Sequence, residues 1–288
     1  MTTGHARLCV LAGTVLFGTT GTAQALGPAG MTASHVGAVR VGLGGLLLLV
    51  VTGLAGAVRD LRSWPLGALL GAGLATAAFQ VAFFAAIART GVAIGSTVAI
   101  AATPVLTGAL AAVMTGRFPG RGWAVATALA VTGAVALCLD GAASDVDPTG
   151  VLLAVAAAGG FAAATLLTKR LVDAGHAPSG VVAVTFCVAG VLLAPTLIAG
   201  DTSPLTTAAG VATIAYLVLV PTVIGYVLFA RGLVGLPGAD AVTLTLAELL
   251  VAAALGVFLL GERPGLVAVG GSLLLVAGLV VAIRSTPS

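Results

Sequence analysis

The second half of this sequence repeats the first at a constant offset of 145 residues. Gly116 aligns with Gly261, and Pro119 aligns with Pro264. Hydrophobic runs and loops line up between such anchors without a gap. The chain is therefore expected to fold as two structurally related halves.

The composition indicates that these halves lie in a membrane. Hydrophobic residues make up 59% of the 288 residues and charged residues 7%, against roughly 25% charged residues in soluble domains. A chain of this length could not enclose so much apolar surface in water, whereas a bilayer acts as its solvent. The net charge of +3 does not indicate a nucleic-acid partner, because the longest positive run is the pair Lys169 and Arg170.

Ten segments are long and apolar enough to cross a hydrocarbon core of roughly 30 Å, which takes about 20 helical residues. They are residues 7–27, 35–57, 65–88, 92–115, 122–139, 149–169, 179–199, 207–230, 237–260 and 265–284. Short loops join them, carry most of the charge and often contain Pro or Gly, which mark helix ends. The fold class is therefore an all-α membrane protein with ten transmembrane helices.

Each half contains five of these segments, and an odd number inverts the second copy relative to the first. We predict a first repeat over residues 1–139, a periplasmic or extracellular linker over 140–148, and a second repeat over 149–288. Inverted repeats of this kind build secondary transporters, which bind substrate near the bilayer midplane where the halves meet. The repeat thus predicts a transport function as well as a fold.

The distribution of Lys and Arg predicts the orientation. With the N-terminus in the cytoplasm, nine of these residues fall on the inner side and two on the outer side. We therefore expect both termini in the cytoplasm and a multi-pass protein of the plasma or inner membrane. The segment 7–27 resembles a secretory signal, but we expect it to be retained because it has a repeat partner in 149–169.

Three polar side chains lie inside predicted helices, where they are costly. Glu248 lies near the centre of 237–260, and burial favours its protonated form, so it could couple transport to protons. The alternative is a carboxyl group held permanently by neighbouring hydroxyls. Arg40 either snorkels to the interface or points inward to a carboxylate or anionic substrate, as an anion contact or part of a gate. Gln80 binds substrate or hydrogen-bonds a neighbouring helix.

The repeat relates Glu248 to Thr103, and this pairing predicts the site. Pro104 follows Thr103 and frees a carbonyl one turn earlier, so a helix break is expected there. Thr103 and Thr245 lie on faces of their helices that would meet across the pseudo-twofold axis, and Tyr226 lies at comparable depth. The predicted substrate-binding residues are Gln80, Thr103, Tyr226, Thr245 and Glu248, with Glu248 also the proton-coupling group.

Over essentially its whole length, the chain resembles the drug/metabolite transporter superfamily, in the ten-helix class built from two EamA-type repeats. Val39-Arg40 before a Gly- and Leu-rich run is similar to the family's second helix. Leu246-Ala247-Glu248 and Leu259-Leu260-Gly261-Glu262 resemble its Glu-Pro and Gly-Glu signatures, and Thr103-Pro104-Val105 resembles the former in repeat one. The resemblance implies export, or less often uptake, of small metabolites, amino acids or drugs.

The chain departs from the family pattern at two positions. Leu249 stands where a Pro usually follows the Glu, and Arg117 stands where a Glu usually follows Gly116. The second change puts a cation on the cytoplasmic side, and it removes any role for a carboxylate there in repeat one.

The favoured function is a secondary transporter, an exporter that works by alternating access and is coupled to protons. A passive facilitator or channel for small solutes stays open, and it would not need Glu248 to titrate. A membrane-embedded enzyme is the third reading, but the sequence holds no Gly-x-Ser-x-Gly or His-Glu-x-x-His motif. We expect a small-molecule substrate and the lipid bilayer as partners, no cofactor and no metal. Substrate, direction and oligomeric state, monomer or homodimer, stay open.

Overall fold

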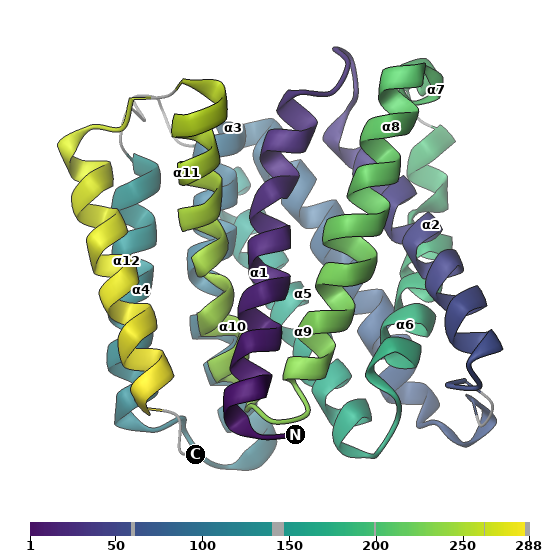
Figure 1. Ribbon diagram of the computed structural model, residues 1–288, viewed down its shortest axis with the longest axis horizontal. Coiled ribbons are helices and arrows are strands. Elements are labelled where there is room, and N and C mark those ends of the chain that lie inside the picture. The colour runs from purple at the N-terminus through teal and green to yellow at the C-terminus, as the bar shows by residue number, and fades with distance from the viewer. Residues whose placement is uncertain (59–60, 140–146, 199, 262, 286–288) are drawn as a thin grey trace.

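The computed structural model describes residues 1–58, 61–139, 147–198, 200–261 and 263–285, and all regular structure within these ranges is helical (Figure 1). Of the predicted linker over 140–148, residues 140–146 lie outside the described ranges. The all-α class predicted from composition is therefore confirmed.

The first repeat contains four long helices that make five crossings. They are α1 (Thr3–Ala25), α2 (Ala33–Leu54), α3 (Leu66–Thr115) and α4 (Arg121–Leu139), with the short η1 (Leu61–Ser63) before α3. The helix α3 crosses twice, because Gly91 inside it adopts φ 80° and ψ 164°. Only glycine adopts such a conformation without a steric penalty, since it lacks a Cβ atom.

The second repeat makes its five crossings with more, shorter elements. They are α5 (Pro148–Asp173), α6 (Pro178–Leu193), η2 (Ala194–Ile198), α7 (Ser203–Thr206), α8 (Ala208–Leu217), η3 (Val218–Gly225), α9 (Tyr226–Gly232), α10 (Gly238–Thr245), α11 (Ala247–Leu260) and α12 (Leu266–Ser285). The elements α8, η3 and α9 form one crossing, and α10 with α11 forms the next.

The described ranges contain nine helices long and apolar enough to span a membrane, and a tenth, shorter apolar helix over Arg121–Leu137. Large apolar side chains on the outside of the bundle, such as Leu54 at 84% exposure and Leu266 at 91%, suit contact with lipid and not water. Both termini lie at the same end of the bundle, as an even number of crossings requires (Figure 1). We call this end the terminal end and the other, where Pro148 begins α5, the linker end.

The 145-residue offset is visible in the packing of the two halves. A Cβ atom added to Gly133 of α4 would lie 2.4 Å from the backbone nitrogen of Leu275 in α12. One added to Gly278 of α12 would lie 2.5 Å from the backbone nitrogen of Ala130 in α4. A shift of 145 residues exchanges these two contacts, so the pseudo-twofold axis passes between α4 and α12.

The other helices also pair across the two repeats. The helix α2 packs on α6, α3 packs on α5, and α1 packs on both α9 and α11. Small residues allow these close approaches, as is common between membrane helices. Figure 1 shows α1 running along α11 and α9 near the middle of the bundle. The interior of the molecule is therefore an interface between repeats.

One helix irregularity was predicted at the wrong place. A break was expected at Pro104, but α3 continues through it with helical backbone angles. The hydroxyls of Thr103 and Thr107 donate hydrogen bonds to two carbonyl groups that precede the proline, Ala99 at 2.6 Å and Thr103 at 2.7 Å.

Candidate functional site

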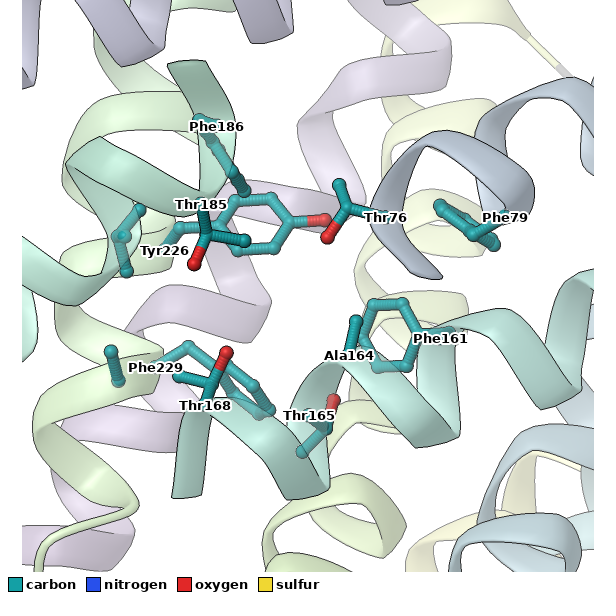
Figure 2. A pocket seen from close by; sticks show the side chains of 12 residues that line it. Thr76, Phe79, Phe161, Ala164, Thr165, Thr168, Thr185, Phe186, Tyr226 and Phe229 are labelled. Atoms are coloured by element: carbon teal, nitrogen blue, oxygen red, sulfur yellow. The ribbon is translucent and has the colours of Figure 1, made fainter. Parts of the chain in front are cut away.

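A small enclosed cavity lies between α3, α5, α6 and α9 (Figure 2). It offers about 40 Å³ to the centres of water molecules, which is room for a few waters and far less than a metabolite needs. Four threonines and five aromatic residues line it with three smaller side chains: Thr76, Thr165, Thr168, Thr185, Phe79, Phe161, Phe186, Tyr226, Phe229, Ala164, Val182 and Ala230.

Aromatic rings surround this cavity and connect it to α1. The Tyr226 ring lies between Phe17 of α1 and Phe186 of α6, with centroids 4.8 and 4.7 Å away. Across the cavity, Phe161 of α5 makes an edge-on contact with Phe79 of α3 at 5.4 Å. Such tilted and edge-on pairs are favourable and fix the rings in place. The cavity wall is therefore built from all four surrounding helices and is largely apolar.

The polar part of the wall consists of hydroxyl groups. Thr76 donates its hydroxyl proton to the carbonyl of Ala72 in its own helix, at 2.8 Å. Within the described ranges, Thr165, Thr168 and Thr185 make no hydrogen bond through their hydroxyls, and the Thr185 Oγ1 is buried. Figure 2 shows the Thr168 and Thr185 hydroxyls directed toward the middle of the cavity, and the Tyr226 phenol oxygen toward Thr76. Hydroxyls without partners are available to a bound molecule.

Glu248 lies in the first turn of α11, where the crossing is interrupted. The Leu246 amide donates to the Thr243 carbonyl at 3.2 Å, and the Leu249 amide donates to the Leu246 carbonyl at 3.1 Å. These short-range bonds tighten one turn at Leu246 and end α10 before α11 begins. The Glu248 side chain is half-buried.

Arg40 of α2 is half-buried. Its positive charge acts electrostatically on both Glu248 and Tyr226. The ion pairs among the described residues do not include Arg40 with Glu248. The two readings open from the sequence, snorkelling to the interface and an inward contact, both stay predictions. Tyr226 lines the cavity. The charges of Arg40 and Glu248 both act electrostatically on its phenol group.

The structure places one of the five predicted substrate-binding residues in the wall of this cavity. Tyr226 lines it, whereas Gln80, Thr103, Thr245 and Glu248 do not. Gln80 is 2% exposed and packs beside α2, so it faces the interior and not lipid. Thr103 and Thr245 are buried, and each hydroxyl donates to a carbonyl of its own helix. These assignments stay predictions.

Sequence reasoning missed the threonines of α5 and α6. Thr165 and Thr168 are three residues apart and therefore lie on one face of α5, which was a readable signal. Thr185 follows the same logic less clearly, because α6 is apolar around it. Its importance is visible only from the cavity, since no pattern in one helix reveals what a neighbouring helix leaves open.

Pro221 lies within an irregular part of the crossing that carries Tyr226. Residues Val218–Gly225 form a π-helix, a widened turn that is frequent at functional sites. Proline has no amide proton to donate to the Leu217 carbonyl. The π-helical register pairs residue 222, and not residue 221, with that carbonyl. The fully buried Thr222 hydroxyl donates to the same carbonyl as well, at 2.7 Å.

Comparisons with known proteins agree in what they find. The model of the EamA-like transporter family matches residues 6–139 and 148–284. A protein of Bacillus subtilis (strain 168), the uncharacterized transporter YwfM, is 37% identical over 278 residues, which cover 95% of this chain and 92% of the relative. A solved crystal structure shares the fold with a TM-score of 0.80 at 21% identity, over 96% of each chain.

Proposed function

Because the chain belongs to the EamA-like transporter family, we propose that it is a secondary transporter that exports small metabolites, amino acids or drugs by alternating access. Transport by a member of this family follows from the match. Export, the mechanism and the coupling to protons are the proposal. The observation that carries it is the half-buried carboxyl group of Glu248 at the turn between α10 and α11, in a bundle whose cavity has room for only a few waters.

The size of the cavity supports alternating access. A site with room for a few waters must enlarge to admit a metabolite, so the helices around it have to move apart. The inverted repeat supplies two equivalent ways to do so, one at each end. At the linker end, Arg89 pairs with Asp147 at 3.4 Å and ties α3 to α5. At the terminal end, Arg7 of α1 acts electrostatically on Asp240 of α10.

Proton coupling is assigned to Glu248. Coupling needs a group whose charge changes as the site faces one side and then the other, and an interior carboxyl group is suited to this. Among the described residues, Arg40 is the one oppositely charged side chain that acts on it. Glu248 also lies at the tightened turn between α10 and α11. A change in its charge would therefore act on the point where the crossing is interrupted.

A passive facilitator is the alternative, and the small volume of the cavity, about 40 Å³, disfavours it because a channel would need a continuous wide path. Catalysis is not part of the proposal, since the family is one of transporters. We place the protein in the plasma or inner membrane with both termini in the cytoplasm, on the strength of the nine-to-two excess of Lys and Arg on the terminal side.

The test is untargeted metabolite profiling of the medium around cells that express the chain, a Glu248→Gln variant or no transporter. We expect at least one small compound to accumulate outside only with the parent protein. Asp173→Asn serves as the control, because it removes an exposed surface carboxylate and leaves the interior unchanged. If the medium of expressing cells matches that of empty cells for every compound, export is wrong.

A further inference from the structure

An apolar groove lies at the linker end of the bundle, between α2 of the first repeat and η2, α7, α8 and η3 of the second. It has a volume of about 620 Å³, within the range of about 300–1,000 Å³ that is usual for sites of small organic ligands. Apolar side chains of both repeats line it, among them Val39 and Leu43 of α2 and Val211, Ala215 and Leu219 of α8 and η3. The groove is separate from the aromatic cavity, because the two share no lining residue.

The groove is open toward the bilayer. Its walls belong mainly to the crossings Ala33–Leu54 and Ala208–Gly232. Within these walls Leu43 is 47% exposed and Val211 is 55% exposed. Lipid is the medium that these side chains meet at this depth, because an apolar surface inside the hydrocarbon region faces lipid and not water.

The polar part of the groove lies at its mouth. Thr202 and Thr206 line the groove, and both lie between the crossing that ends at Ile198 and the one that begins at Ala208. This segment is at the linker-end surface of the membrane, whereas the apolar walls extend from it into the hydrocarbon region. An apolar groove with a polar mouth at this surface matches the polarity of a phospholipid, from its ester groups to its acyl chain.

The repeat shows why the helices leave this space. The equivalent interface at the terminal end, between α3 and α6, is closed by a glycine: a Cβ atom on Gly73 would lie 2.4 Å from Cγ1 of Val188. A shift of 145 residues relates Gly73 to Val218 and Val188 to Leu43. Val218 and Leu43 both line the groove, and both are larger than their counterparts. Their side chains therefore prevent the close approach that glycine allows at the terminal end.

A tryptophan also fills the terminal-end interface and has no counterpart at the linker end. Trp64 is 6% exposed and packs in one cluster with Leu69. The repeat relates Leu69 to Ile214, which lines the groove, and Trp64 to Ala209. A methyl group cannot occupy the volume of an indole ring. The volume that Trp64 supplies at the terminal end therefore has to come from another molecule at the linker end.

We infer that the groove binds an acyl chain of one phospholipid from the linker-end leaflet, with the ester groups of the lipid at the mouth beside Thr202 and Thr206. The acyl chain packs between the two repeats, as Trp64 does at the terminal end. Walls on several sides give it more dispersion contacts than neighbouring lipids would. Water is a poor occupant, because apolar cavities do not hold it. The inference concerns a bound lipid and not the transported compound, so it does not depend on the proposed function.

The experiment places the full chain in phosphatidylcholine vesicles that contain a phosphatidylcholine with a photoactivatable diazirine in the middle of one acyl chain. Mass spectrometry of the peptides then locates the labelled residues. Val276 of α12 is the matched control for Leu43, because each lies ten residues into a helix that begins at the linker end. The two side chains are also similarly exposed, at 44% and 47%. We expect several-fold more label at Leu43 than at Val276, since only Leu43 lines the groove.

Variants that fill the groove give a second measurement. Ala215 lines the groove and is exposed, so Ala215→Phe should place a ring in the groove without disturbing the core. Ala212→Phe is the control, because Ala212 is exposed on the same helix but does not line the groove. In native mass spectrometry after extraction in detergent, the parent and Ala212→Phe should each retain one phospholipid. Ala215→Phe should lose it.

Equal labelling of Leu43 and Val276 would overturn the inference, because it would mean that the groove meets lipid no differently from the rest of the surface. Retention of the phospholipid by Ala215→Phe as by the parent would also overturn it. So would a parent protein that carries a second copy of the chain in place of a lipid. If Ala215→Phe does not fold, the labelling of the parent protein decides the question.

Discussion

A Cβ atom on Gly190 of α6 would lie 2.7 Å from the Cα of Gly42 in α2. The repeat generates the same contact a second time, since a Cβ on Gly45 would lie 2.7 Å from the backbone nitrogen of Cys187. Gly45 and Gly190 are equivalent positions, as are Gly42 and Cys187. The helices α2 and α6 therefore touch through their backbones at two symmetric points.

These contacts make a prediction about stability. Gly190→Ala and Gly45→Ala should each lower the free energy of unfolding by about 1–3 kcal/mol, because the backbones must separate to admit a methyl group. The two losses should be similar in size. Thermal stability of the purified protein in detergent measures this. Gly270→Ala is the control, since a Cβ there meets nothing within 4 Å; a loss in the control as large as in Gly190→Ala would refute the packing account.

The π-helix makes a second prediction. Thr222→Val keeps the shape of the side chain but removes the hydroxyl that donates to the Leu217 carbonyl. A buried hydrogen bond contributes about 0.5–1.5 kcal/mol, so the variant should unfold at a lower temperature. Thr222→Ser keeps the donor and should recover most of the loss. Equal destabilisation by valine and serine would show that packing of the methyl group, and not the hydrogen bond, matters there.

The orientation can be tested with single cysteines in a background without the natural ones. Arg121→Cys at the terminal end and Asp201→Cys at the linker end are both exposed. We expect an impermeant thiol reagent added to intact cells to label Asp201→Cys only. Arg121→Cys should react after the membrane is opened. The reverse pattern would place both termini outside and would contradict the orientation inferred from the Lys and Arg distribution.

Asp147 makes stability depend on pH at the linker end. Its carboxylate accepts a hydrogen bond from the Thr149 amide at 2.9 Å and lies 3.4 Å from Arg89. The Thr149 amide, followed by Arg89, holds the pKa of Asp147 below its ordinary value of 3.8. Because the pKa of Asp147 is lower in the folded state than in the unfolded state, its carboxylate stabilises the folded protein at pH values above the ordinary pKa. This contribution is lost as the pH falls through the folded-state pKa.

We therefore expect Asp147→Ala to lower the melting temperature at neutral pH, by a small amount because the group is exposed. The difference from the parent should shrink as the pH falls below about 3.9, the ordinary pKa of Asp, because the carboxylate of the parent then takes up a proton. Melting curves of both proteins across this range measure it. A difference that stays constant with pH would mean that the charge of Asp147 contributes nothing.

The helices could be predicted from the sequence because their signal is local. The lengths of the apolar segments, with Pro and Gly residues at their ends, predicted ten crossings. The 145-residue offset predicted the inverted repeat. Helix irregularities depend on hydrogen bonds that composition does not show. Pro104 lies in a continuous helix, whereas the crossing that carries Glu248 is interrupted at Leu246 although Leu249 stands in place of the family's Pro.

The site was predicted only in part for a related physical reason. Depth within a helix can be counted along the sequence, so Glu248, Arg40 and Tyr226 stood out. Which wall of a helix faces a cavity depends on its neighbours, so Thr185 was not found. Thr245 was expected to offer its hydroxyl, but it donates to the Val242 carbonyl at 2.7 Å. Hydroxyls on membrane helices commonly bond their own backbone, and the sequence does not show which do.

The most direct test of the central claim is accumulation of an exported compound by proteoliposomes that hold a pH gradient across their membrane. The parent protein should concentrate the compound against the concentration gradient of that compound. This accumulation should stop when the pH gradient is dissipated. Glu248→Gln keeps the volume and much of the hydrogen bonding of the side chain but cannot exchange a proton. We expect it to lose this accumulation. If Glu248→Gln concentrates the compound as well as the parent does, Glu248 is not the coupling group and the proposed mechanism is wrong.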